Sequence, residues 1–203
     1  MVEHVLYINL ESRKDRRDSI ISVLSCFPDA ERINGVANNY GCLGASQSHI
    51  KALEYAISKN WDHVLIVEDD MVWNKFDHYP KLLELMEDYD VIVLGGIHVD
   101  HDPLTHKLNK CNSTGAYLVS RHYYQILLNN FKEGCRLLEN ELYKPRRFAL
   151  KQESRHDVLY RIDVWWHSLQ KDNWFILPMM YSPPGYSNVL NKIVDNSNLF
   201  LKE

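Results

Sequence analysis

The 203-residue sequence lacks several features that would assign a class at once. It has no apolar run near the roughly 18 to 20 residues of a membrane-spanning helix, and it does not open with a basic and then apolar leader. It also lacks a large charge of one sign, because 23 Lys and Arg stand against 27 Asp and Glu for a net charge of -4. We therefore expect a cytoplasmic protein with no transmembrane segment and no general attraction for nucleic acid.

Cysteine is scarce, and the common nucleotide-binding and hydrolase motifs are missing. The four cysteines are widely spaced with no C-x-x-C pair, so neither a zinc knuckle nor a redox pair is expected, and we interpret them as free thiols. No segment matches G-x-x-x-x-G-K-[ST], G-x-G-x-x-G or G-x-S-x-G. The sequence therefore carries none of the usual signatures of a P-loop, a dinucleotide-binding fold or an α/β-hydrolase.

Strand-like apolar runs alternate with segments of helical spacing over most of the chain. Strands are expected at 4–10, 32–36, 63–67, 91–94, 116–119 and 174–177, and helices at 12–26, 43–58, 79–89, 121–131 and 161–171. The polar segment that ends near residue 113 and the charged segment 132–157 are expected to be irregular. The alternation predicts the α/β class, an α/β/α sandwich around a mostly parallel sheet. With no linker and no repeat, residues 1–203 are predicted to form a single domain.

Three carboxylates, those of Glu68, Asp69 and Asp70, directly follow the apolar strand segment at 63–67. Because side chains alternate across a strand, Glu68 and Asp70 are expected to point to one side and Asp69 to the other. Converging like charges repel, and Mg2+ or Mn2+ relieves this repulsion by taking one or two carboxylates together with substrate phosphate oxygens. The sequence thus predicts a metal site at Glu68 and Asp70, with a solvated acidic turn as the alternative.

The first helical segment begins with basic side chains. Ser12 and Asp15 have the spacing of a capping box, which would start the helix just after the first strand. Four cations nevertheless lie in its first turns, where the helix dipole disfavours positive charge by about 0.3 to 1 kcal/mol each. Arg13, Arg16 and Arg17 have the spacing of one helix face beside an anion-attracting N-terminus, which makes them candidates to bind a phosphate or nucleotide. A solvated basic face is the alternative.

Two further segments carry side chains of chemical interest. A glycine-flanked turn leads into the second helical segment, where Ser46 and His49 share one face, although a single histidine is more often hydrogen-bonded within a fold than catalytic. Asp163 stands beside Trp165 and Trp166, an apolar environment that suits a carboxylate to accept a proton. Capping of the helix is the rival role of Asp163.

The distinctive segments follow one another in a recognisable order. They are VLYINL at 5–10 with Arg13, Asp15, Arg16 and Arg17, RINGV at 32–36, Gly41 and Cys42 with Ser46, Ser48 and His49, VEDD at 67–70, TGAYLVS at 114–120, Ile162 with Asp163, and Ser187, Asn188 and Val189. In this succession, which spans nearly the whole chain, the sequence resembles glycosyltransferase family 25, the lipopolysaccharide-biosynthesis and procollagen galactosyltransferase family.

The resemblance implies a GT-A fold and an inverting hexosyltransferase that takes galactose or glucose from a UDP-sugar, with a divalent metal, usually Mn2+. It implies that Glu68 and Asp70 hold the metal and that Asp163 is the catalytic base. Together with the motifs above, it implies donor-binding residues at Asn9, Arg13, Arg16, Arg17, Ser46, His49, Glu68 and Asp69. The acceptor would be a hydroxyl of a glycan or glycoprotein, and the enzyme would act in the cytoplasm or peripherally at a membrane where glycans are assembled.

Two other functions remain open at this point. The short chain, and Asn188 where an acid is expected after Ser187, also fit a non-catalytic nucleotide-sugar binding or glycan-assembly protein. Clustered acids also hold Mg2+ in phosphoesterases and nucleotidyltransferases. Transfer of a sugar, as opposed to release of phosphate or joining of a nucleotide, distinguishes these functions.

Overall fold

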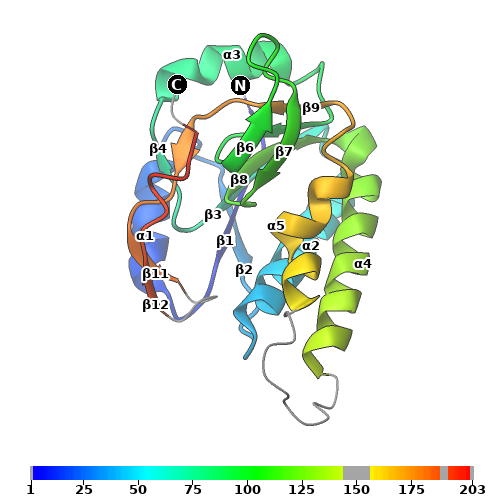
Figure 1. Ribbon diagram of the computed structural model, residues 1–203. Helices are drawn as coiled ribbons and strands as arrows, with labels where there is room; N and C mark the ends of the chain where they lie inside the picture. Colours follow the sequence, from blue (N-terminus) through cyan, green and yellow to red (C-terminus); the bar gives the residue numbers. More distant parts are fainter. Residues whose placement is uncertain (1, 144–155, 188–191, 202–203) are drawn as a thin grey trace.

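The central sheet in the computed structural model has six strands in the order β2-β1-β3-β8-β5-β9 (Figure 1). Their bounds are Val5–Asn9 (β1), Glu31–Asn34 (β2), His63–Glu68 (β3), Val91–Val93 (β5), Ala116–Ser120 (β8) and Trp174–Ile176 (β9). β8 is antiparallel to both of its neighbours, β3 and β5, and the remaining pairs are parallel. The structure describes residues 2–143, 156–187 and 192–201. The predicted mostly parallel α/β sandwich is confirmed.

Helices cover both faces of this sheet (Figure 1). Their bounds are Lys14–Val23 (α1), Gly41–Lys59 (α2), Tyr79–Leu85 (α3), Tyr124–Tyr143 (α4) and Ile162–Trp165 (α5). Short 3-10 turns lie at Phe76–His78, Arg121–Tyr123, His156–Tyr160 and Trp166–Ser168. α1 and α3 pack on one face, and α2, α4 and α5 pack on the other.

The side chains of strand β3 pack against the helices on both faces of the sheet. Val64 and Ile66 pack in the cluster beneath α2 and α4, whereas Leu65 and Val67 pack in the cluster beneath α1 and α3. Because all four side chains are fully buried, both faces of the strand are closed to polar groups. Glu68, at the carboxyl end of the strand, is the first side chain of β3 after this buried run that can reach a cleft.

In the described part of the chain, three two-stranded sheets accompany the central one. They pair β4 (Val72–Trp73) with β10 (Met180–Tyr181), β6 (Ile97–His101) with β7 (Leu108–Asn112), and β11 (Gly185–Ser187) with β12 (Lys192–Val194). The β6–β7 hairpin occupies the polar segment that was expected to be irregular. Only Leu108 and Cys111 of β7 are fully buried, so its composition does not reveal the strand.

The helix boundaries required three corrections. Helix α4 continues to Tyr143 through the first part of the segment 132–157, which was expected to be irregular, and residues 144–155 lie outside the described part. The segment 161–171 contains a short α5 and a 3-10 turn instead of one helix. The buried Trp166 anchors that turn, because its indole Nε1 donates to the backbone O of Cys111 at 3.1 Å. Ser12 does not cap α1, whose N-cap residue is Arg13 without a side-chain cap bond.

Two sequence-level expectations concern membranes and thiols. None of the helices in the described ranges has both the length and the apolar character needed to cross a bilayer. The four cysteines are free thiols, as predicted, with Cys111 buried and Cys26 exposed.

Candidate functional site

The carboxylate turn, Glu68 to Asp70, lies at the carboxyl end of β3. The strand ends at Glu68, and Asp69 and Asp70 form a turn in which the N–H of Met71 donates to the backbone O of Glu68 at 3.2 Å. The alternation of a strand therefore stops at Glu68. The prediction that Asp69 points away from its two neighbours is wrong, because all three residues line the same cavity.

Three adjoining cavities surround the carboxylate turn. The α1 cavity, of about 320 Å³, is lined by α1 and the segment 182–185. The α2 cavity, of about 270 Å³, is lined by the ends of β1 and β2 and the first turns of α2. The α5 cavity, also about 270 Å³, is lined by α5 and the segment 113–115. Asp70 and Ser187 line all three, so the cavities form one cleft.

A guanidinium bridges two of the carboxylates. The Nη1 atom of Arg16 lies 3.0 Å from Oδ1 of Asp69 and 2.9 Å from Oδ2 of Asp70. Asn9, which is 1% exposed, donates from Nδ2 to Oδ2 of Asp69 at 2.7 Å and to the backbone O of Arg13 at 3.0 Å. Asn9 lies outside the residues that line the cleft. Asn9 therefore joins the start of α1 to the carboxylate turn without lining the cleft.

Helix α1 does not bring all three predicted arginines together. Arg13 lines the α1 cavity, and its guanidinium pairs with Asp15 at 2.7 Å. Arg17 lines none of the three cavities, and its Nε lies 4.0 Å from the exposed Asp18. Arg13 precedes the helix with a non-helical backbone, so the expected i, i+3, i+4 spacing does not hold from this residue. The predicted common helix face is therefore not formed, although Arg13 and Arg16 both line the α1 cavity.

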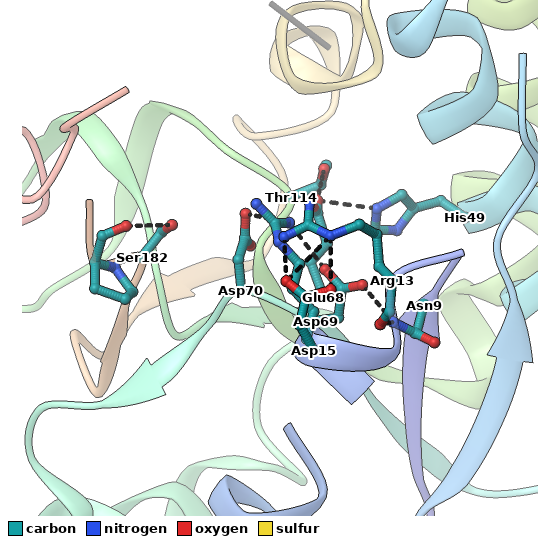
Figure 2. Close-up of polar contacts among 11 residues, drawn as sticks. Asn9, Arg13, Asp15, His49, Glu68, Asp69, Asp70, Thr114 and Ser182 are labelled. Atoms are coloured by element: carbon teal, nitrogen blue, oxygen red, sulfur yellow. Dashed lines mark hydrogen bonds and ion pairs between the residues drawn. The ribbon is translucent and has the colours of Figure 1, made fainter. Parts of the chain in front are cut away.

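Glu68 is held by two buried donors (Figure 2). Its Oε1 accepts from Oγ1 of Thr114 at 2.9 Å and lies 3.2 Å from Nε2 of His49. The other ring nitrogen of His49, Nδ1, lies 3.0 Å from the hydroxyl of Tyr117. Burial alone would raise the pKa of Glu68. The hydrogen bond and the charge of His49, together with the hydrogen bond from Thr114, outweigh burial and bring this pKa below its ordinary value. Glu68 is therefore ionised.

The two aspartates behave differently from Glu68. Burial, followed by the charge of Glu68, raises the pKa of Asp70 to about 6 against the attraction of Arg16. Burial also raises the pKa of Asp69, although Asn9 and Arg16 oppose it. The turn carries more negative charge than Arg16 neutralises, and a bound cation would relieve the excess.

Helix α2 presents a different serine from the one predicted. The hydroxyl of Ser46 donates to the backbone O of Cys42 at 3.1 Å, and Ser46 lines none of the three cavities. Ser48 lines the α2 cavity, where its Oγ accepts from the N–H of Val36 at 2.8 Å and donates to Gly44 O. Sequence reasoning missed Ser48 and Thr114 as site residues. Their presence in the segments of the family resemblance was the available signal.

Asp163, the predicted proton acceptor, lines the cleft. It is in the first turn of α5 and lines the α5 cavity together with Glu68 and Asp70. Its backbone O accepts from Nδ2 of Asn112 at 3.2 Å, which ties α5 to the β6–β7 hairpin. The structure thus brings three carboxylates from two distant segments to one cavity. Asn188, noted in the sequence, lies outside the described residues.

The donor set can be tested against the predicted metal. Within residues 2–143, 156–187 and 192–201, no three His, Cys, Asp or Glu side chains are grouped to hold a metal ion. Mg2+ and Mn2+ can nevertheless bind through one or two carboxylates plus phosphate oxygens, and Asp70 offers hard oxygens in the part of the cleft that all cavities share. Asp70 therefore fits such an ion. Glu68 could contribute its second oxygen, Oε2, because its two side-chain hydrogen bonds both go to Oε1.

Comparison with known proteins supports the fold. No protein-family profile matches the sequence, and no curated protein matches it. Among solved structures, the chain is similar to A197 from STIV, with a TM-score of 0.53 and 14% identity over 95% of this chain and 93% of that one. It is also similar to a glycosyltransferase involved in the glycosylation of the major capsid of PBCV-1, with a TM-score of 0.45 and 9% identity over 88% of this chain and 92% of that one. The A197 likeness supports the α/β fold alone.

Proposed function

We propose that the protein is a glycosyltransferase of the kind found in the family that its sequence resembles. It transfers a hexose, galactose or glucose, from a UDP-sugar to a hydroxyl of a glycan or glycosylated acceptor. One observation carries the proposal: Asp70, paired with Arg16 at the carboxyl edge of the parallel strands, lines all three cavities of the cleft. In α/β sheets, ligands bind outside the carboxyl ends of strands.

The three cavities suit the parts of such a donor and its acceptor. The α2 cavity is lined by the apolar Ile8, Leu10 and Val36 and by other residues of the segment 35–38, which suits a nucleoside. Arg16 and Arg13 supply positive charge beside the carboxylate turn, which suits the diphosphate. The α5 cavity, with Asp163, suits the acceptor hydroxyl. The sugar would then lie between the nucleoside and the acceptor.

The residues of the chain have separate tasks in the reaction. Asp163 accepts the proton of the acceptor hydroxyl as its oxygen bonds to the anomeric carbon, and the bond from that carbon to the diphosphate oxygen breaks. Attack from the side opposite the diphosphate inverts the anomeric centre. Arg16 offsets negative charge on the departing diphosphate. Asp70 would hold Mn2+ or Mg2+, which when bound supplies further positive charge at the diphosphate.

The test compares Asp70→Asn with Asp18→Asn, an exposed carboxylate outside the cleft. Calorimetry should give binding of UDP-galactose or UDP-glucose to the wild type and to Asp18→Asn in Mn2+, with binding to Asp70→Asn weakened roughly ten-fold or more. Turnover over an acceptor panel should release UDP and transfer the sugar. Unchanged Mn2+-dependent donor turnover in Asp70→Asn would refute the role of Asp70.

The same assays separate the alternative functions. Donor binding without hydrolysis or transfer would favour a non-catalytic nucleotide-sugar binding protein. Release of free phosphate, or attachment of a nucleotide to an acceptor, would favour a phosphoesterase or nucleotidyltransferase.

A further inference from the structure

Glu68 occupies the junction between two cavities. It lines both the α2 cavity and the α5 cavity, and its side chain is 34% exposed. Under the proposed function, the first cavity takes the nucleoside and the second takes the acceptor. The group that lies between them is the transferred sugar, so Glu68 faces the sugar.

The contact with Glu68 places a hydrogen on one ring nitrogen of His49. A carboxylate only accepts, so Nε2 of His49 must carry the hydrogen that points to Oε1. The other ring nitrogen of His49, Nδ1, lies 3.0 Å from the hydroxyl of Tyr117, whose pKa burial raises well above its ordinary value, so that this hydroxyl stays protonated. Thr114 adds a second donor to the same Oε1. Hydrogen bonds therefore connect Tyr117 to His49, and both His49 and Thr114 to Glu68.

The partners of Glu68 have little freedom to move. His49 is 1% exposed, Thr114 4% and Tyr117 0%. The rings of His49 and Tyr117 are stacked with centroids 5.7 Å apart. In the part of the chain that the structure describes, no group donates a hydrogen bond to the other oxygen, Oε2. The carboxylate is thus held through Oε1, and Oε2 remains available to a ligand.

We propose that Glu68 binds hydroxyls of the transferred sugar through Oε2, that His49 and Thr114 position it, and that this site selects a neutral sugar over an anionic one. This inference rests on the proposed function. A fixed carboxylate accepts hydrogen bonds from hydroxyl groups and makes them stronger than a neutral acceptor does. A sugar that carries its own carboxylate would instead meet the charges of Glu68, Asp69 and Asp70 in one turn.

The first test separates the sugar from the nucleotide. Calorimetry in Mn2+ would compare UDP, UDP-galactose, UDP-glucose and UDP-glucuronate on the wild type and on Glu68→Gln. We expect the wild type to bind a UDP-hexose at least ten-fold more tightly than UDP-glucuronate. We expect Glu68→Gln to weaken the UDP-hexose roughly ten-fold while UDP changes less than about three-fold. Equal weakening of UDP and the UDP-hexose would refute sugar binding and indicate a metal or diphosphate role for Glu68.

The second test addresses the positioning residues. Thr114→Val removes the hydroxyl that donates to Glu68 at nearly constant side-chain shape, whereas Thr114→Ser keeps that hydroxyl. His49→Phe removes the ring N–H that donates to Glu68, whereas the amide of His49→Gln can supply a donor in its place. We expect Thr114→Val and His49→Phe to lower the preference for UDP-hexose over UDP, and Thr114→Ser and His49→Gln to retain it at least partly. Ser46 lies on α2, as His49 does, but outside the cleft, so Ser46→Ala should leave the preference for UDP-hexose over UDP unchanged. An unchanged preference in folded Thr114→Val and His49→Phe would refute the positioning role.

The outcomes also separate this inference from the proposed function. A wild type that binds neither UDP nor any UDP-hexose would overturn both. A wild type that binds a UDP-hexose, with the same preference over UDP and over UDP-glucuronate in Glu68→Gln, would overturn this inference alone.

Discussion

Arg16 and Asp70 are 54 residues apart in the sequence, yet Nη1 of Arg16 lies 2.9 Å from Oδ2 of Asp70. This ion pair joins α1 to the turn after β3 and sets a positive group beside the crowded carboxylates. The same nitrogen also reaches Asp69. Under the proposed function, this pair contributes both to the stability of the cleft and to diphosphate binding.

Replacing this guanidinium should affect both properties. Arg16→Gln leaves Asp69 and Asp70 without their shared cation, so we expect the free energy of unfolding in urea to fall by about 1 to 3 kcal/mol. UDP binding should weaken as well. Arg17→Gln, one residue further on and beside an exposed partner, should stay within about 0.5 kcal/mol of the wild type. Equal stability of the two variants would show that the Arg16 contacts contribute nothing.

The raised pKa of Asp70 predicts a particular dependence of stability on pH. Its pKa is about 6 in the folded protein against an ordinary value of 3.8. Between these values the folded state holds a proton that the unfolded chain has released, so the free energy of unfolding should fall as pH rises from about 4 to about 6. Asp70→Asn removes the titrating carboxyl and with it this pH-dependent loss of stability. At pH 7 we expect the variant to be more stable than the wild type by about 1 to 3 kcal/mol.

Urea unfolding from pH 4 to pH 8 measures this effect. Asp69, whose pKa is also raised, contributes in the same direction in both proteins, so a reduced slope remains in the variant. Asp18→Asn serves as the exposed control. Parallel stability curves for wild type and Asp70→Asn would contradict the prediction.

Asp163 is expected to act in transfer and not in donor binding. Because it lines the α5 cavity away from the proposed nucleoside side, Asp163→Asn should lower the rate of transfer about 100- to 10,000-fold and leave the dissociation constant of the UDP-sugar unchanged. UDP release and calorimetry measure the two quantities. A normal transfer rate would exclude Asp163 as the base, and a matching loss of donor binding would assign it to the donor site.

Gly44 allows a close approach between α2 and the segment after β2. A Cβ at this position would lie 2.5 Å from the backbone O of Val36, and the segment 35–38 lines the α2 cavity. Gly44→Ala should therefore reduce stability by about 1 to 3 kcal/mol and weaken UDP binding.

A second glycine provides the control for this variant. The Cβ of Gly134→Ala would meet the side chain of Trp165 at 2.5 Å, between α4 and α5 and outside the α2 cavity. It should also lose stability but keep UDP binding. Loss of UDP binding in both variants would mean that global destabilisation, and not the shape of the α2 cavity, is responsible.

Much of the architecture could be predicted because it depends on local pattern. The run at 64–67 is apolar at every position, and a strand buried on both faces requires this. The hairpin β6–β7 and the true length of α4 could not be read in this way. In the hairpin, burial falls on a few residues such as Leu108 and Cys111, whose partners come from remote segments.

The site was predictable in position but not in orientation. The acidic cluster was predicted at a strand end, where the structure has it, and the structure places Asp163 in the same cleft. The direction of Asp69 was wrong because the strand ends at Glu68, two residues before Asp70, to which the alternation had been extended. Ser46 was also misplaced, because its hydroxyl bonds within its own helix. Both outcomes depend on local backbone geometry that residue type alone does not specify.

By itself, the sequence determined which side chains stand at the ends of buried strands, since apolar runs and their polar ends follow from the cost of burying unpaired polar groups. Only the tertiary structure decided their partners. Thr114 reaches Glu68 across 46 residues, and Asn9 reaches Asp69 across 60. Hydrogen bonds need donor and acceptor within about 3 Å in a suitable direction, and only the packing of helices onto the sheet sets those distances.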